Sequence, residues 1–393
     1  MNELSIPRRD FLRATAAGAA GAIFAWPGVA TAASDTIRIT DPFHGAILNR
    51  RHGTEVDGGL RITVSGEAPA DEPVTVNGAA ASRSGKTFTA DVVLREQETD
   101  IVARAGAAGG PEHRVRVVRD RYSQPRYRFS VDDNSFFLRD IAQKQYASLF
   151  DCFYLKTLKD LSAKYGTKFV LNIYYTTGDD FNLTQFPDRY RGEWKDNADW
   201  LRLAFHAYAD KPDRPYQDAP VEKLIADLDL VAEQIRRFAG DEVYTPPTVI
   251  HWGMTRPEAF KALAGRGVRV LSGYFCPGKD GWDVNYRLDA ARSEYLWRHD
   301  ALMDFDSRIV FSRVDIVCNN TPVEKVVPTL EPLTKDPNMA EVIDVFTHEQ
   351  YFWPFYAGYL PDHAQRLDAA LRFVTERGYK PVFYHEGYLR GQS

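Results

Sequence analysis

The sequence has few cysteines, no clustered basic residues and no pattern of repeated membrane spans. Three cysteines in 393 residues are too few for a disulfide scaffold, although one bond can form, and none lies in a CxxC motif. The absence of Lys/Arg runs and a formal net charge of −5 argue against nucleic acid or an anionic membrane as a partner. A hydrophobic share of 44% with 26% charged residues indicates a globular protein.

The first 33 residues have the composition of an export signal. Arg8-Arg9 and Phe11-Leu12 precede a soft apolar stretch, residues 14–29, and the small residues 30–32 form a cleavage pattern. The paired arginines resemble a twin-arginine signal. We therefore expect a periplasmic, cell-surface or secreted protein with no membrane span once the signal is removed. An uncleaved anchor and a buried helix are the alternatives for the same stretch.

Aromatic content changes sharply near residue 120. Residues 34–120 contain only Phe43 and Phe88, whereas six of the seven tryptophans follow residue 121. Short alternating apolar segments separated by turn residues favour an immunoglobulin-like β-sandwich over residues 34–120. This part resembles the Ig-like modules of exported bacterial carbohydrate enzymes, which implies a role in carbohydrate binding or spacing.

Residues 121–393 alternate predicted strands with predicted helices. The clearest helix is 220–238, where apolar residues recur at helical spacing. Such repeated units predict an α/β fold, a complete or incomplete (β/α) barrel. The expected strands are 127–131, 168–175, 200–205, 248–251, 268–274, 308–316, 342–347 and 381–384.

Four of these strands run into ionisable residues at their carboxyl ends. Asp132-Asp133, His206, His251 and His348-Glu349 each follow an apolar segment. In a barrel these ends converge on one face, where active sites are built. We therefore expect these side chains around one cleft. The alternatives are a capping turn for the aspartates and buried structural roles for the histidines.

The spacing within this set favours a metal site. Two adjacent carboxylates are most easily accommodated when a cation lies beside one of them. His206 and Asp210 are four residues apart and share a face on a helical turn. With Asp133 they offer one nitrogen and two carboxylates, which suits Zn²⁺ and also Co²⁺, Mn²⁺ or Fe²⁺. His251 and Glu349 are further candidates for metal or substrate binding, and a surface His–Asp pair is the alternative for His206 and Asp210.

At these residues the chain resembles the polysaccharide deacetylase family, the NodB-homology domain of carbohydrate esterase family 4, over about residues 125–390. The motifs that carry the resemblance are Ser130–Asn134 with its Asp-Asp pair, His206–Asp210 in place of HxxxH, Thr245–Trp252, Phe346–His348 and Glu376–Val382. The sequence departs from the family at Asp210, which stands for a histidine, and in the third motif, where His251-Trp252 replaces an arginine.

The resemblance implies a metal-dependent removal of acetyl groups from an amino-sugar polysaccharide. It assigns Asp132 as the base, His348 as the general acid, and Asp133 and His206 as metal ligands, with Asp210 in the place of the third. Metal-bound water would attack the acetamide carbonyl. Rim residues predicted to contact sugar, with packing as the alternative, are Tyr208, Arg214, Tyr216, Trp252 and Trp353.

Two other functions compete with deacetylation. A glycoside hydrolase on the same barrel would pair carboxylates such as Asp132 and Glu349, and a polysaccharide lyase would use a His or Tyr base. Either would shorten chains without releasing acetate. A non-catalytic carbohydrate-binding protein would bind glycan equally well after Asp132→Asn.

Overall fold

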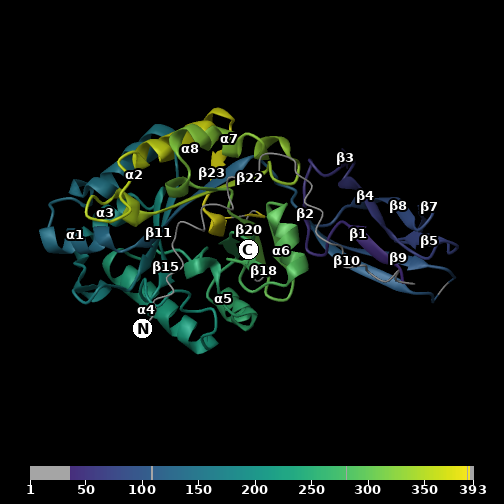
Figure 1. Cartoon of the computed structure of the whole chain (residues 1–393), viewed down its shortest axis with the longest axis horizontal. Helices are drawn as coiled ribbons and strands as arrows, with labels where there is room; N and C mark the ends of the chain where they lie inside the picture. The colour runs from purple at the N-terminus through teal and green to yellow at the C-terminus, as the bar shows by residue number, and fades with distance from the viewer. Residues whose placement is uncertain (1–35, 108, 280, 387, 390–393) are drawn as a thin grey trace.

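Figure 1 shows the protein as a computed structural model that describes residues 36–107, 109–279, 281–386 and 388–389. The predicted export signal, residues 1–33, lies outside the described residues. Within the described part, no helix is both long enough and apolar enough to span a membrane. Cys152, Cys276 and Cys318 are buried free thiols, so the disulfide that the sequence allows is not formed.

The N-terminal part folds as two mostly antiparallel sheets, with strand orders β1-β4-β8-β7 and β2-β10-β9-β5-β6. Apolar side chains from both sheets meet in one cluster, for example Val64 and Phe88 with Ile101 and Val117. This packing is that of a β-sandwich, and its immunoglobulin type stays a prediction. The strands are β1 Arg38–Asp41, β2 Ile47–Leu48, β3 Thr54–Val56, β4 Gly59–Glu67, β5 Val74–Val76, β6 Ala79–Ala80, β7 Ser82–Ser84, β8 Thr87–Leu94, β9 Glu98–Ala105 and β10 Glu112–Arg119.

The C-terminal part contains the predicted alternation of strands and helices. Its strands are β11 Arg126–Asn134, β12 Phe169–Tyr174, β13 Thr176–Thr177, β14 Phe181–Asn182, β15 Leu201–Ala207, β16 Val270–Gly273, β17 Cys276–Gly278, β18 Gly281–Asp283, β19 Ala301–Asp304, β20 Ile309–Arg313, β21 Ile316–Val317, β22 Val342–His348 and β23 Lys380–Pro381. Its α-helices are α1 Phe136–Lys144, α2 Phe153–Tyr165, α3 Arg191–Asp196, α4 Val221–Phe238, α5 Phe260–Gly265, α6 Ala290–Trp297, α7 Val323–Leu330 and α8 His363–Glu376.

Backbone hydrogen bonds close these strands into a ring. The sheet β15-β12-β11-β22-β21 is parallel throughout, and β16 runs parallel to β20, which leads into β21. The predicted strand 248–251 does not form as such, but segment 243–248 bridges the gap. Thr245 N–H donates to Leu203, and Ser272 N–H donates to Thr248. The arrangement is therefore a closed barrel, with α2, α4 and α8 among the helices on its outside (Figure 1).

Alternation along the strands separates the outer core from the barrel interior. On β11, Tyr127, Phe129 and Val131 belong to the large apolar cluster that includes residues of the helices. The alternate residues Arg128, Ser130 and Asp132 are buried on the opposite face of the strand, inside the barrel. The same parity on β15 and β22 places His206 and His348 with the inward set. Strand geometry therefore positions three predicted site residues on one surface.

A buried ion pair lies inside the barrel, nearer to the starts of the strands than Asp132 and His348. Arg128 Nη1 lies 2.6 Å from Asp344 Oδ1, and the Arg128 and Asp344 side chains are 1% and 0% exposed. Arg128 also donates to Ser272 Oγ at 3.2 Å and to Thr248 Oγ1 at 2.9 Å, so one guanidinium joins four parts of the ring.

We expect Arg128→Met to destabilise the protein by about 3–5 kcal/mol, because it leaves the Asp344 charge buried without its partner. Urea unfolding measures this loss. The double variant Arg128→Met/Asp344→Val removes both charges and should recover most of the lost stability. Equal stability of wild type and Arg128→Met would contradict this view of the barrel interior.

The sandwich is joined to the barrel where the barrel strands begin. Ile47 of β2 and Val118 of β10 pack in one apolar cluster with Val342, the first residue of β22. Met303 N–H donates to the Gly45 carbonyl at 2.8 Å, which continues the sandwich onto β19. Arg51 Nε lies 2.8 Å from Glu341 Oε2 across the same junction.

Candidate active site and metal-ligand group

An irregularity in β11 turns two consecutive aspartates into the barrel. The pairing of β11 with β12 shifts register between Val131 and Asn134, and Asp133 has a φ of +59°. Regular alternation would point Asp133 away from Asp132. The bulge and the left-handed conformation redirect it inward, which regular strand geometry does not allow.

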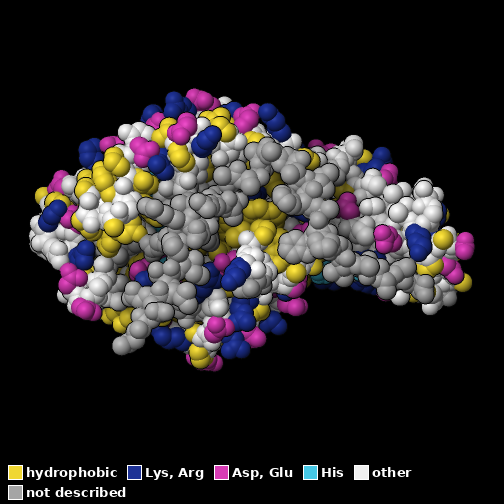
Figure 2. All heavy atoms as spheres, in the orientation of Figure 1, with side chains coloured by type: hydrophobic (Ala, Val, Ile, Leu, Met, Phe, Trp, Pro, Cys, Tyr) yellow, Lys and Arg dark blue, Asp and Glu magenta, His cyan; other side chains and the backbone are white. Residues whose placement is uncertain are grey.

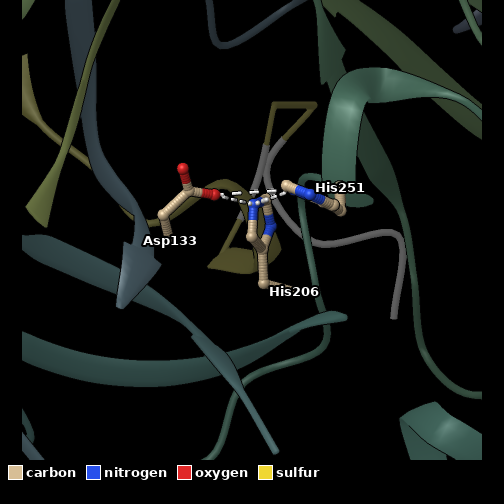
Figure 3. A group of neighbouring side chains, drawn as sticks. All are labelled: Asp133, His206 and His251. Atoms are coloured by element: carbon tan, nitrogen blue, oxygen red, sulfur yellow. Dashed lines mark hydrogen bonds and ion pairs between the residues drawn. The ribbon is translucent and has the colours of Figure 1, made fainter. Parts of the chain in front are cut away.

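Asp133, His206 and His251 form a compact group of metal-type ligands (Figure 3). His206 Nε2 lies 3.1 Å from Asp133 Oδ1 and 3.0 Å from His251 Nδ1, and the remaining edge, Asp133 Oδ1 to His251 Nδ1, is 3.5 Å. Ligands about 2.05 Å from a tetrahedral Zn²⁺ lie about 3.3 Å apart. The three donor atoms therefore have the separation that a small divalent cation requires.

The charges of the group also suit a cation. Burial by itself raises the pKa of Asp133, but the electrostatic interactions with His348, His206 and His251 and the hydrogen bond with His206 bring it well below its usual value. Burial and the neighbouring charge of His206 lower the pKa of His251 to about 3. Asp133 is therefore an anion and His251 a neutral imidazole at pH 7, the forms in which both residues bind metal.

His206 has the opposite shift. Its burial disfavours the charged ring, but the charges of Asp132 and Asp133 outweigh burial and raise its pKa. Two carboxylates thus lie close enough to His206 to stabilise a positive charge on its ring. A divalent cation between Asp133 and the histidines would take the place of that positive charge.

Two neutral side chains hold the Asp133 carboxylate. The Tyr174 hydroxyl at the end of β12 donates to Asp133 Oδ1, and it lies 3.2 Å from His251 Nδ1. Gln350 Nε2 donates to the other oxygen, Oδ2, at 2.8 Å. Hydrogen bonds to a ligating carboxylate fix its orientation and are typical of metal sites.

Asp132 and His348 flank the ligand group on adjacent strands. The two residues are paired in the β11–β22 register. Asp132 is buried and accepts a hydrogen bond from Asn172 Nδ2 at 2.5 Å. The His348 side chain is 25% exposed, and its Nε2 lies 3.9 Å from Asp133 Oδ2. A buried carboxylate and a solvent-accessible imidazole therefore lie beside the same three donors.

Asp210, predicted as a ligand, does not belong to the donor group, and His251 takes that place. The backbone carbonyl of Asp210 instead accepts a hydrogen bond from His251. This hydrogen bond partly offsets the lowering of the His251 pKa. The turn after β15 therefore brings the main chain of Asp210 to the site. An i, i+4 spacing predicts a shared face only on a helix, and residues 207–211 are not helical.

Glu349 and Trp353 have structural roles rather than the predicted contacts with metal or substrate. Glu349 is 0% exposed and accepts the backbone N–H groups of Ser135, Phe136 and Phe137 at the start of α1. Trp353 is buried and donates its Nε1–H to Glu349 Oε1 at 3.0 Å. The carboxylate satisfies amide groups that the first turn of a helix leaves without partners.

The remaining predicted sugar contacts differ in accessibility. Tyr216 is 1% exposed, and its hydroxyl is bonded to Asp227 Oδ2 at 2.8 Å, so it packs in the core. Arg214 makes a bidentate pair with Asp283 at 2.5 and 2.8 Å and lies over the Trp252 ring. Tyr208 is 41% exposed and stacks on Tyr175. Tyr208 is therefore the predicted contact that is most open to a ligand.

Sequence reasoning missed the neutral residues of the site. Asn172, Gln350 and Asn319, which contacts His348 Nδ1 at 2.9 Å, carry no charge and match no motif. A usable signal existed for Asn172, because it has the inward parity of β12, opposite to Leu171 and Ile173 in the apolar cluster. Asn319 lies in a short turn after β21 and gave no such signal.

His363, the first residue of α8, makes the stability sensitive to acid. Burial lowers its pKa to about 3, against an ordinary value of 6.5. Its contribution is complete above pH 6.5 and is lost as the pH falls, because the unfolded chain then binds a proton that the folded chain does not. Between pH 6.5 and 5 the loss is about 2 kcal/mol. We expect His363→Gln to flatten the pH dependence of urea unfolding in this range by that amount. An unchanged slope would contradict a neutral buried His363.

No protein-family model matches the sequence, and neither does any curated protein. A CE4 family pseudoenzyme from Bacillus anthracis is 9% identical, with a TM-score of 0.34, over 66% of this chain and 63% of its own. A CE4 esterase from Streptococcus mutans is 11% identical, with a TM-score of 0.36, over 66% and 85%. A 4-α-glucanotransferase from Thermococcus litoralis is 14% identical, with a TM-score of 0.43, over 67% and 40%. The chain thus spans less than two thirds of the pseudoenzyme, and CE4 proteins are among the solved structures to which it is similar.

Proposed function

We propose that this protein is an exported, metal-dependent hydrolase that removes acetyl groups from an amino-sugar-containing polysaccharide. The observation that carries the proposal is the juxtaposition of a three-donor group with Asp132 and His348 at the carboxyl ends of the barrel strands. A three-ligand group with a proton acceptor on one side and a second proton-transfer group nearby is the arrangement that amide hydrolysis needs.

Asp133, His206 and His251 would hold the cation, which would polarise the acetamide carbonyl and lower the pKa of a bound water. Asp132 is buried beside this group and would accept the proton of the attacking water. Asn172 keeps the Asp132 carboxylate in place through its amide. The His348 side chain is partly exposed to solvent and would donate a proton to the departing amine.

The rival reading as a glycoside hydrolase has less support, because its second carboxylate is committed elsewhere. Asp132 would need a carboxylic partner on the opposite side of the scissile bond. Glu349, the sequence candidate, has no accessible surface and holds the start of α1.

Acetate release from a panel of N- and O-acetylated polysaccharides tests the proposal. Purified protein without its first 33 residues is assayed with and without added Zn²⁺, Co²⁺ or Mn²⁺, and the chain length of the products is followed in parallel. We expect metal-dependent acetate release at constant chain length, and about 10²–10⁴-fold slower release by Asp132→Asn. Shortened chains without acetate would overturn the proposal in favour of glycosidic cleavage. Glycan binding unaffected by Asp132→Asn, with no product, would identify a binding protein.

A further inference from the structure

We propose that Asn319 is a positioning residue that fixes the tautomer of His348, as the last member of a hydrogen-bond relay from His363 through Thr347. The effect on catalysis rests on the proposed function. The relay itself consists of hydrogen bonds among four side chains, His363, Thr347, Asn319 and His348. None of Asn319, Thr347 and His363 belongs to the ligand group.

Asn319 is held from several sides. It is buried in the turn that follows β21, and Arg366 of α8 donates to its backbone carbonyl at 3.0 Å. Its side-chain Nδ2 donates to Asn320 Oδ1 at 2.7 Å. Since the NH₂ group of the amide faces Asn320, the oxygen Oδ1 is the atom presented to His348.

That orientation determines where the protons lie. Asn319 Oδ1 can only accept, and it lies 2.9 Å from His348 Nδ1. His348 Nδ1 must therefore carry the proton. The Thr347 hydroxyl donates to the same oxygen at 3.2 Å. In the relay that we propose, Thr347 gives its single hydroxyl proton to Asn319 and accepts from His363 Nε2, which lies 2.7 Å away.

The proposed relay runs from His363 Nε2–H to Thr347 and from the Thr347 hydroxyl to Asn319 Oδ1. His348 Nδ1–H is the second donor to the same oxygen. The partner of one ring nitrogen decides which form of a histidine is present. In His348 the other nitrogen, Nε2, is the atom turned toward Asp133. Proton exchange with a substrate in the cleft is thereby confined to Nε2.

The first test reads the tautomer directly by NMR of the full chain labelled with ¹⁵N at histidine. Two-bond ¹⁵N–¹H correlations distinguish the two neutral forms, and signals of His348 are assigned by their loss in His348→Gln. We expect the Nδ1–H form in wild type and in Asn319→Asp, which keeps an acceptor oxygen. Asn319→Leu has no acceptor and should shift the neutral ring toward the Nε2–H form.

The second test separates positioning from stability. We expect Asn319→Leu to lower kcat for acetate release by about 10²–10⁴-fold, the usual contribution of general acid–base catalysis. KM should stay within about threefold of the wild-type value. Asn285→Leu is the matched control, because Asn285 is a buried asparagine whose side chain bonds Arg287, Leu288 and Ser293 and makes no contact with His348. It should leave both the tautomer and kcat unchanged.

The outcomes separate the relay from the function. A wild-type His348 in the Nε2–H form overturns the relay without any Asn319 variant, even if Asn319→Leu does not fold. A tautomer that does not respond to Asn319→Leu overturns it as well. If the tautomer responds while wild type releases no acetate, the relay stands and the proposed deacetylase function fails.

Discussion

Replacing His206 with alanine should lower the affinity for a divalent metal by at least about 10³-fold, since changes in residues that merely support the ligands already cost about 10–100-fold. His206 Nε2 is the donor closest to both of the others, at 3.1 Å from Asp133 and 3.0 Å from His251. Without it, Asp133 and His251 remain 3.5 Å apart as a two-residue site. Titration of the metal-free protein against a chromophoric chelator measures the loss, and acetate release should fall to background.

His113→Ala is the matched control for this loss. His113 lies in the sandwich, where its Nδ1 accepts from Ile39 N–H at 3.2 Å, so the substitution removes one histidine without touching the barrel. Its metal affinity should equal that of wild type. If His206→Ala also bound the metal as wild type does, the three-donor group would not be the metal site.

Asp132→Asn should lower kcat by about 10²–10⁴-fold, the usual contribution of a general base, while metal affinity stays within about threefold. The amide has nearly the shape of the carboxylate and can still meet Asn172, but it cannot take a proton from water. Asp132 is also outside the donor group. Steady-state acetate release and the chelator titration, performed on the same preparations, separate these two effects.

Asp160→Asn provides the comparison for this second variant, because Asp160 is 64% exposed on α2 and pairs with Lys156. Asp160→Asn should change neither kcat nor metal affinity. A loss of metal affinity in Asp132→Asn as large as that in His206→Ala would make Asp132 a ligand and would leave the base unassigned.

Strand periodicity made much of this site predictable. Asp132, His206 and His348 each end an apolar strand, and the barrel brings them to one face as expected. His251, offered as a metal or substrate residue, is one of the three donors. In each case the information is local, because the parity of a strand determines which side chains face inward.

The failures have a different physical origin. Glu349 follows His348 by one residue, but its carboxylate is used to satisfy the start of α1, a contact between residues more than 200 positions apart. Tyr216 was expected at the rim and is buried because Asp227 of α4 accepts its hydroxyl. The alternation of apolar residues along a strand reveals neither of these two pairings. The bulge that turns Asp133 inward is equally invisible, since an Asp-Asp pair is compatible with a regular strand.

The position of the sandwich limits how the protein can engage a long chain. It packs at Val342, where β22 begins, whereas His348 ends the same strand. The seven residues of β22 place Val342 and His348 about 20 Å apart. The junction with the sandwich therefore lies at the opposite end of the barrel strands from the ligand group. If the proposed function holds, a sandwich that bound the polymer would hold a stretch away from the sugar unit at His348, and it would serve as a tether rather than as part of the site.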